Sequence, residues 1–180
     1  MDIVSTGSSK PAPDMGAFFD ENFTYVWNTL RRFGVRDADL EDLVQEVFLK
    51  VHVRSADYDA SRAIRPWLFG FAYRVASDYR RLARHRIEAL REPAEVVDPA
   101  RPADERIEAE EERALVETAL EAVEIDRRAV FVLHDIHEVP VPEVAETLGI
   151  PLNTAYSRLR VAREEFATAV KRLRKARGVP

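Results

Sequence analysis

The feature that most constrains this chain is the spacing of its apolar residues, which recur every three or four positions in short segments. Residues 14–33 show it well, with five large apolar side chains: Phe19, Phe23, Val26, Trp27 and Leu30. This period is that of a helix with one buried face, whereas a half-buried strand alternates with a period of two. The sequence contains no alternating segment and no internal repeat. We therefore predict an all-α fold.

Helix starts and stops divide the first half of the chain into three elements. We expect helices over residues 14–33, 39–53 and 66–81 or beyond, with a polar loop over residues 55–63. Asp39 is a favourable N-cap, and a proline such as the one at position 66 suits the first turn of a helix. Four large side chains of the third helix lie four apart and are expected in the core, in preference to platforms for base stacking: Trp67, Phe71, Val75 and Tyr79.

The second half is expected to hold further short helices. Apolar spacing predicts one over residues 107–123, and Asp126 is the predicted N-cap of the next. Pro140 fits only the start of a helix, Gly149 ends that helix, and Asn153 is the predicted N-cap of the last one.

Residues 92–103 contain three prolines and little apolar content, so they are predicted to be a flexible linker. This linker separates two small helical domains, residues 14–91 and 104–180, and residues 1–13 form a disordered tail rich in serine, glycine and proline. We also expect the acidic segment from Glu92 to Asp126 to stay flexible in the free protein and to let the two domains reposition.

The net charge of −5 hides an uneven distribution. Residues 64–91 carry seven arginines against two acids, and residues 156–180 carry eight basic residues against two acids. Residues 92–126, between them, carry thirteen acids against three arginines. A local field depends on where charges sit, so two basic blocks around an acidic one indicate two DNA contacts and a spacer. Ordinary solvated helix faces are the alternative interpretation.

The composition excludes several classes of function. The chain has no cysteine, which excludes disulfides and thiolate metal sites. No run of about 18 apolar residues is present, so we expect no membrane insertion and a cytoplasmic protein. The sequence also lacks a Gly-rich phosphate loop and a Ser/His/Asp arrangement, so we predict no catalytic residue, no metal site and no cofactor.

Residues 141–160 have the pattern of a helix-turn-helix with Gly149 in the turn. The second helix and its extension carry a buried stripe: Ala155, Leu159, Ala162, Phe166, Ala169 and Leu173. Opposite this stripe, at about 100° per residue, lie Asn153, Ser157 and Arg160, flanked by Thr154, Tyr156, Arg158 and Arg163. Such a small, polar and basic face suits the DNA major groove. An antiparallel helix pair with a glycine turn is the alternative.

Three segments resemble extracytoplasmic-function (ECF) RNA polymerase sigma factors, a branch of the sigma-70 family. Residues 39–51 (DLEDLVQEVFLKV) are similar to the helix of that family that binds the polymerase clamp, and residues 64–81 (IRPWLFGFAYRVASDYRR) to its promoter-melting helix. The stretch from Arg128 to Arg163, with LGIP and SRL, looks like the family's fourth domain. The segments stand in the family's order and cover most of residues 14–175.

The resemblance implies an alternative sigma factor, not an enzyme, that binds core RNA polymerase and directs promoter-specific transcription initiation, with an anti-sigma factor as a further partner. Residues 14–91 would be sigma region 2 and residues 104–180 sigma region 4. Polymerase binding falls to three residues on the exposed side of the second helix: Asp42, Gln45 and Glu46. Contacts to the minus-ten element fall to Arg74, Ser77, Arg80 and Arg81. The seven polar residues opposite the buried stripe would meet the minus-thirty-five element.

The sequence departs from the family's pattern at four places. Arg74 stands where the family usually has asparagine, and Tyr156 stands where lysine is common, which affects the promoter sequence that is read. Residues 123–124 (Val-Glu) replace Leu-Pro, and residues 138–140 (Glu-Val-Pro) replace Gly-Leu-Ser, which affects turns and caps.

Two other classes of function fit part of the chain. Residues 134–137 (His-Asp-Ile-His) resemble the His-Asp pair of metal-dependent phosphohydrolases, but the only other histidines are His52 and His85. An operator-binding regulator would use the helix-turn-helix, but it leaves residues 39–53 and 64–81 without a role.

Overall fold

The computed structural model describes residues 15–90 and 105–177, with side chains described for residues 16–83 and 111–177. Every regular element in those ranges is helical, which confirms the predicted fold class. In chain order they are α1 (Met15–Arg32), α2 (Asp37–Val53), η1 (Ser55–Asp57), α3 (Ile64–Leu90), α4 (Glu105–Glu121), α5 (Ile125–Phe131), η2 (Val132–Ile136), α6 (Val141–Leu148) and α7 (Leu152–Ala176). None of the described helices is long and apolar enough to cross a membrane.

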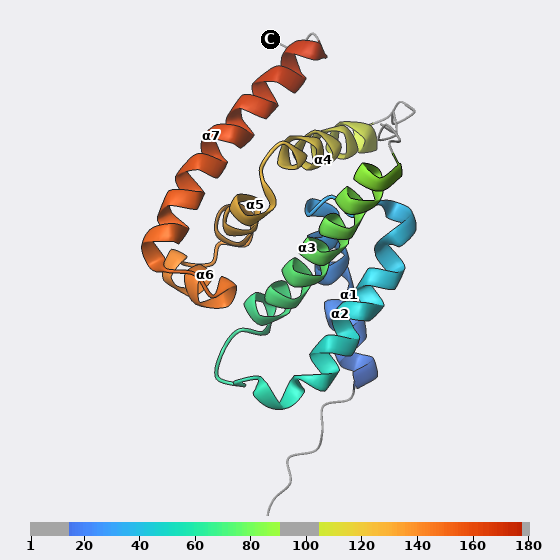
Figure 1. Ribbon diagram of the computed structural model, residues 1–180, viewed down its shortest axis with the longest axis vertical. Helices are drawn as coiled ribbons and strands as arrows, with labels where there is room; N and C mark the ends of the chain where they lie inside the picture. The colour runs from blue at the N-terminus through green and yellow to red at the C-terminus, as the bar shows by residue number, and fades with distance from the viewer. Residues whose placement is uncertain (1–14, 91–104, 178–180) are drawn as a thin grey trace, which may run out of the picture.

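The first three long helices pack into one bundle (Figure 1). Val26 and Leu30 of α1 and Phe33 just after it are fully buried, and they belong to the same core cluster as Val44 and Val47 of α2. Gly34 follows α1 with a φ of 78°, a left-handed conformation that glycine adopts without steric cost. The predicted bounds of this helix are therefore correct to within one residue.

Along α3 the predicted buried stripe is only partly correct. Val75 is buried, but Trp67, Phe71 and Tyr79 are half-buried and pack against the edge of the core. The residues of α3 that fill the core lie beside that stripe: Leu68, Phe69, Ala72, Val75 and Ala76. The three rings thus keep one edge accessible, because α2 and α1 both pack on the neighbouring face of α3.

The three predicted N-caps are wrong, because each helix begins slightly earlier than expected. Helix α2 begins at Asp37, so Asp39 lies inside its first turn and its carboxylate accepts hydrogen bonds from Arg36 Nε (2.8 Å) and the Tyr79 hydroxyl (2.6 Å). Helix α7 begins at Leu152 after an extended Pro151, which leaves Asn153 exposed in the first turn with no capping bond.

At the start of α5 the capping side chain is Glu124 and not Asp126. The Glu124 carboxylate accepts from the backbone N–H of Asp126 at 3.0 Å and of Arg127 at 3.4 Å. An extended residue with an acceptor side chain satisfies the free N–H groups of a first turn. The freed Asp126 carboxylate instead accepts from the hydroxyl of Tyr73 in α3 at 2.7 Å.

The acidic segment that we expected to be flexible is helical over most of its described part. Residues 105–121 form α4, which packs against α1 and α7, and α5 follows after a short turn. Leu115, Ala119 and Leu120 form a buried stripe on α4, and the acidic residues lie mainly on its other side. Residues 92–103, the predicted linker, lie outside the described residues.

The C-terminal helices enclose a second layer of side chains around α5. Arg128 is fully buried there, beside Val130 and Leu133. Helix α6 begins after Pro140 as predicted, and Gly149 ends it with a φ of 66°. Just before it, Glu138 has a φ of 58°, a conformation that favours glycine, at a position where the ECF pattern has glycine.

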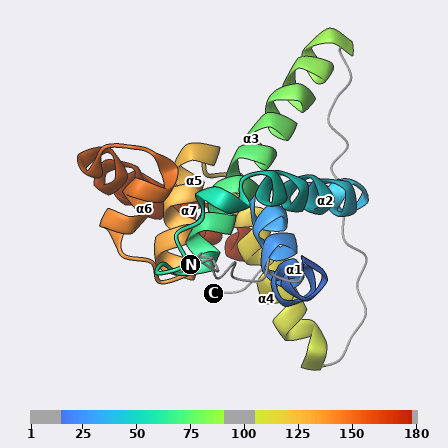
Figure 2. The ribbon, with the colours of Figure 1, turned by 90° about the horizontal axis from the view of Figure 1, so that it is seen from below.

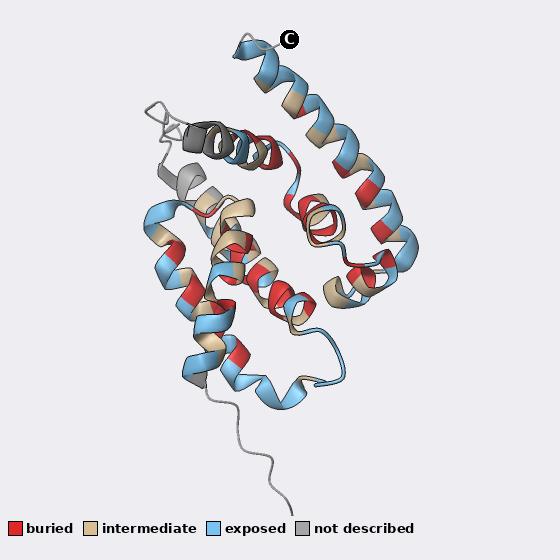
Figure 3. Cartoon of the chain, turned by 180° about the vertical axis from the view of Figure 1, so that it is seen from behind, coloured by how far each residue is buried: buried red, intermediate tan, exposed pale blue. Residues whose placement is uncertain are grey.

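Buried residues of both halves form one continuous cluster. Helix α4 contacts α1, and α6 contacts α3, so the C-terminal helices lie along one side of the first bundle (Figures 1 and 2). The burial pattern agrees with this arrangement, since buried positions on α3 and α7 recur on one side of each helix, whereas α5 is buried on nearly all sides (Figure 3).

Candidate nucleic-acid and protein interfaces

The predicted polymerase-binding residues share the exposed face of α2. Asp42 and Gln45 are exposed, and Glu46 is half-buried with its carboxylate 2.8 Å from the ammonium of Lys50. The structure therefore brings the three residues together at the surface, opposite the buried residues Val44 and Val47.

Two apolar residues that we did not single out from the sequence continue this face. Leu49 is 66% exposed and Val53 is 78% exposed. Leu49 lies four positions after Gln45 and Val53 lies eight positions after it, so all three fall on the same side of the helix. Large apolar side chains on an otherwise exposed helical face indicate a protein interface, and their spacing from Gln45 was the signal that could have revealed them. We call Asp42, Gln45, Glu46, Leu49 and Val53 the α2 face.

An open groove of about 930 Å³ lies between the end of α2, the loop that follows, the first half of α3 and α6. Three aromatic rings line it in a row, with 5.0 Å between the ring centres of Tyr58 and Trp67 and 4.9 Å between those of Trp67 and Phe71. The Arg74 guanidinium lies 5.9 Å from the ring centre of Phe71. Stacking rings and cations of this kind suit unpaired nucleotides.

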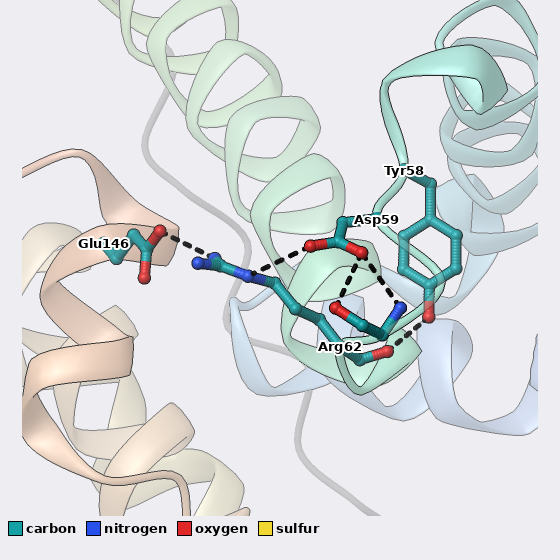
Figure 4. A network of polar contacts seen from close by, with 5 residues as sticks. Tyr58, Asp59, Arg62 and Glu146 are labelled. Carbon is teal, nitrogen blue, oxygen red and sulfur yellow. Dashed lines mark hydrogen bonds and ion pairs between the residues drawn. The ribbon is translucent and has the colours of Figure 1, made fainter.

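The loop beside this groove is ordered by its own polar contacts (Figure 4). Asp59 accepts hydrogen bonds from the backbone N–H and the hydroxyl of Ser61, at 2.9 and 2.7 Å. The Tyr58 hydroxyl donates to the backbone carbonyl of Arg62 at 2.5 Å. From the sequence this segment was only a polar loop, and neither Tyr58 nor Arg62 was predicted as a site residue.

The four predicted minus-ten residues divide into two groups in the structure. Arg74 and Arg81 are exposed, although Arg81 lies 3.0 Å from the Asp78 carboxylate. The hydroxyl of Ser77 is buried, and Arg80 donates to the backbone carbonyl of Phe33 at 3.0 Å. Ser77 and Arg80 thus face the interior, and Arg80 satisfies a carbonyl at the end of α1.

The helix-turn-helix has the predicted geometry. Ala155, Leu159 and Ala162 of α7 are buried against α5 and α6, and Phe166 is half-buried with its ring 4.9 Å from that of Phe131. Three of the predicted base-reading side chains are exposed on the opposite side: Asn153, Ser157 and Arg160. Tyr156 is 52% exposed beside them, and Thr154 is half-buried.

The three arginines in the first half of α7 are engaged by carboxylates. Arg160 lies 2.8 Å from Glu164 one turn along the helix. Arg158 donates to Asp126 at 2.9 Å. Arg163 donates two hydrogen bonds to Asp135, at 2.8 and 2.6 Å, and these bonds hold the pKa of that carboxyl below its usual value (the fork-shaped guanidinium matches a carboxylate).

The two histidines of the His-Asp-Ile-His segment have structural contacts. His134 Nδ1 is 2.8 Å from the backbone carbonyl of Val139, and His137 lies between α1 and α3 with the Tyr25 hydroxyl 2.9 Å from its Nδ1. Within residues 16–83 and 111–177, no group of three or more His, Cys, Asp or Glu side chains is placed to hold a metal ion.

The groove and the helix-turn-helix are neighbours in this structure. Arg62, beside the groove, lies 2.6 Å from Glu146 of α6 (Figure 4). A Cβ atom added to Gly70 of α3 would lie 3.5 Å from the carbonyl oxygen of Thr147, so the two helices cross closely there. Glu143, Glu146 and Thr147 of α6 form one wall of the groove.

Comparisons with known proteins identify both halves of the chain. Residues 18–86 match the model of sigma-70 region 2, and residues 113–166 match that of sigma-70 region 4. The chain is 27% identical to the RNA polymerase sigma factor NccH of Alcaligenes xylosoxydans xylosoxydans over 145 residues, which are 78% of each chain. It is 29% identical to the ECF RNA polymerase sigma factor SigL of Mycobacterium tuberculosis, covering 88% of this chain and 90% of the relative.

The fold is also that of a solved sigma factor structure. CnrH in complex with the cytosolic domain of CnrY aligns with a TM-score of 0.61 and 24% identity over 87% of each chain. The sigma factor family consists of non-catalytic transcription initiation factors that act on RNA polymerase in the cytoplasm. Since the matches to regions 2 and 4 together cover more than half of its residues, the chain belongs to the sigma-70 family, as an alternative sigma factor of the ECF type.

Proposed function

We propose that this sigma factor binds core RNA polymerase through the α2 face. The observation that carries the proposal is the combination on one exposed helical face of acid and amide groups, Asp42, Gln45 and Glu46, with the exposed apolar side chains of Leu49 and Val53. An apolar patch with a polar rim is the usual composition of a specific protein interface.

We propose that the groove holds unpaired bases of the minus-ten element. The row of Tyr58, Trp67 and Phe71 offers stacking surfaces, and Arg74 at its edge is placed to meet the backbone. Arg81 extends the cationic surface along α3, while Ser77 and Arg80 need a rearrangement before they meet DNA, because they face the interior.

For the minus-thirty-five element we propose a division of labour along α7. Asn153, Ser157 and Arg160 read base edges, with Tyr156 and Thr154 beside them, because they are the side chains opposite the buried stripe. Arg158 and Arg163 contact phosphates on either side. Both exchange a carboxylate of their own domain for a phosphate when they do so, which lowers the net gain of each contact.

The partners and location follow from the same reasoning. CnrH was solved with the cytosolic domain of CnrY, and by analogy we propose that an anti-sigma factor holds this chain inactive. We further propose that it works in the cytoplasm and is not an enzyme, since the histidines that suggested a hydrolase bind neighbouring groups of the fold. An operator-binding regulator is not favoured, because it leaves the region 2 match without a role.

Run-off transcription with purified core polymerase tests this function. Genomic fragments are transcribed with and without the chain, and transcripts that start at fixed positions only in its presence are expected. A triple variant Asp42→Ala, Gln45→Ala and Glu46→Ala should lose these transcripts while its helix content stays unchanged. Start sites that do not depend on the chain would contradict the proposal.

A further inference from the structure

His137 joins the two halves of the molecule. It follows η2 in the C-terminal half, and its ring lies against Tyr25 of α1, with 4.9 Å between ring centres, and edge-on to Phe69 of α3 at 5.7 Å. Tyr25 Oη is 2.9 Å from His137 Nδ1, and Arg32 Nη1 is 3.1 Å from His137 Nε2. One imidazole from region 4 is thus bound by two side chains from region 2.

The chemistry of these partners fixes the protonation state of the ring. A guanidinium can only donate, so Nε2 must accept from Arg32 and carries no proton. Nδ1 then holds the proton of the neutral ring and donates it to Tyr25 Oη, while the Tyr25 hydroxyl donates to the backbone carbonyl of Arg65 at 3.1 Å. In this series of hydrogen bonds, from Arg32 through His137 and Tyr25 to the Arg65 carbonyl, each donor faces an acceptor. That match holds only while His137 is neutral.

Protonation of His137 would place an N–H against the N–H groups of Arg32 and a second positive charge beside it. Arg65 of α3 adds to this repulsion, and no carboxylate is among the groups that shift the pKa of the histidine. Glu117 of α4 interacts electrostatically with Arg32, and Arg128 of α5 donates to the Arg32 carbonyl at 3.2 Å. Burial, together with Arg32 and Arg65, lowers the pKa of His137 to about 4.

We propose that neutral His137 is a latch that holds region 4 against region 2 in the free protein, and that its protonation opens the molecule. While the latch is closed, α6 forms a wall of the groove and Glu146 occupies Arg62. Opening the latch removes this wall and releases Arg62 from Glu146, which leaves Asp59 as its partner. The inference goes beyond the proposed function, because it concerns the free chain and requires neither polymerase nor DNA.

The direction of the pH dependence follows from the two states. In the open form the histidine is expected to have its ordinary pKa of 6.5, and in the closed form about 4. The closed form binds fewer protons than the open form. The stabilisation of the closed form by neutral His137 is therefore complete above pH 6.5 and is lost as the pH falls toward 4. From these two pKa values, the ratio of closed to open molecules should fall about 25-fold between pH 7.5 and pH 5.

Energy transfer between two dyes tests the latch directly. The chain has no cysteine, so Ala56→Cys in η1 and Ala167→Cys in α7, both at exposed positions, accept one dye each. Transfer efficiency should be high at pH 7.5 and fall reversibly by pH 5, with the helical circular dichroism unchanged.

Three substitutions in the labelled chain separate the latch from other pH effects. His137→Gln keeps an acceptor for Arg32 and a donor for Tyr25 without a titrating group, so its transfer efficiency should not depend on pH. His137→Lys carries a permanent charge and should be open already at pH 7.5. His134→Gln, three residues away within region 4, should respond to pH as the parent chain does.

Two results would overturn the proposal: no change in transfer efficiency between pH 7.5 and 5 in the parent chain, or the same loss in His137→Gln. Because no DNA or polymerase enters the assay, either failure leaves the proposed sigma factor function untouched. Conversely, a chain that opens with acid but does not support transcription would refute that function and retain the latch.

Discussion

Replacing Arg128 with methionine tests how the two halves are held together. This guanidinium is fully buried in α5, where it donates to the backbone carbonyl of Val123 through Nε (3.2 Å) and Nη2 (2.9 Å) and to that of Arg32 through Nη1 (3.2 Å). It therefore binds carbonyls at the ends of α4 and α1, one in each half of the molecule. Burial lowers the pKa of Arg128 to about 10, so the group remains a cation at neutral pH.

The expected loss can be worked out from these bonds. A hydrogen bond from a charged donor contributes about 1.5–3 kcal/mol, and Arg128→Met leaves two carbonyl oxygens without it. Removing the buried charge recovers part of its desolvation cost, so we expect a net loss of about 3 kcal/mol in the free energy of unfolding. Urea denaturation followed by circular dichroism measures it.

The neighbouring Arg127→Met is the matched control. Arg127 pairs with Glu165 at 2.9 Å, but both side chains are about one-third exposed, so its loss should cost at most about 1 kcal/mol. Equal losses for the two variants, or a loss below about 1 kcal/mol for Arg128→Met, would refute the role given to the buried guanidinium.

Three further predictions follow from single positions. Gly149→Ala should cost about 1 kcal/mol in thermal or urea unfolding, because its φ of 66° is strained for alanine while no atom lies within 4 Å of the added methyl; a stabilised variant would contradict this. Glu124→Ala should cost about 1 kcal/mol in urea unfolding by removing the cap of α5, and Glu124→Asp should lose less; equal stability of all three chains would contradict this. In titrations of promoter DNA at several salt concentrations, Arg160→Ala should relax base preference in the minus-thirty-five element at a cost of about 1–3 kcal/mol, whereas Arg163→Ala should weaken binding to all sequences and reduce the salt slope by about one; two variants that fail alike would contradict the division of labour.

Sequence reasoning predicted the helices well because periodicity reports directly which side of a helix is buried. It located α1 to within one residue and placed Asn153, Ser157 and Arg160 at the surface opposite the buried stripe of α7. It failed at the caps, since an N-cap depends on where the preceding chain becomes extended, as it does at Arg36 and Pro151.

The contacts between the two halves could not be predicted from the sequence. Periodicity says that a face is buried but not what covers it, so the joint of His137 with Tyr25 and Arg32 was outside its reach. The exposed Leu49 and Val53 were within reach, because both continue the exposed side of α2. Apolar spacing predicted a helix over residues 107–123, where α4 lies, but the expectation that the acidic segment stays flexible was wrong, because a charged composition describes only the solvated side of a helix.

The most direct test of the account is the affinity of the chain for core RNA polymerase. Labelled full-length chain is titrated with purified core enzyme, alone and as the Asp42→Ala, Gln45→Ala, Glu46→Ala variant. A double variant Asp20→Ala and Glu21→Ala, which removes two exposed acids from α1, controls for the change in net charge. We predict tight binding of the parent chain and the control, and binding weakened by at least about tenfold, or 1.4 kcal/mol, in the α2 variant. A parent chain that does not bind, or a folded α2 variant that binds as the parent does, would contradict the central claim.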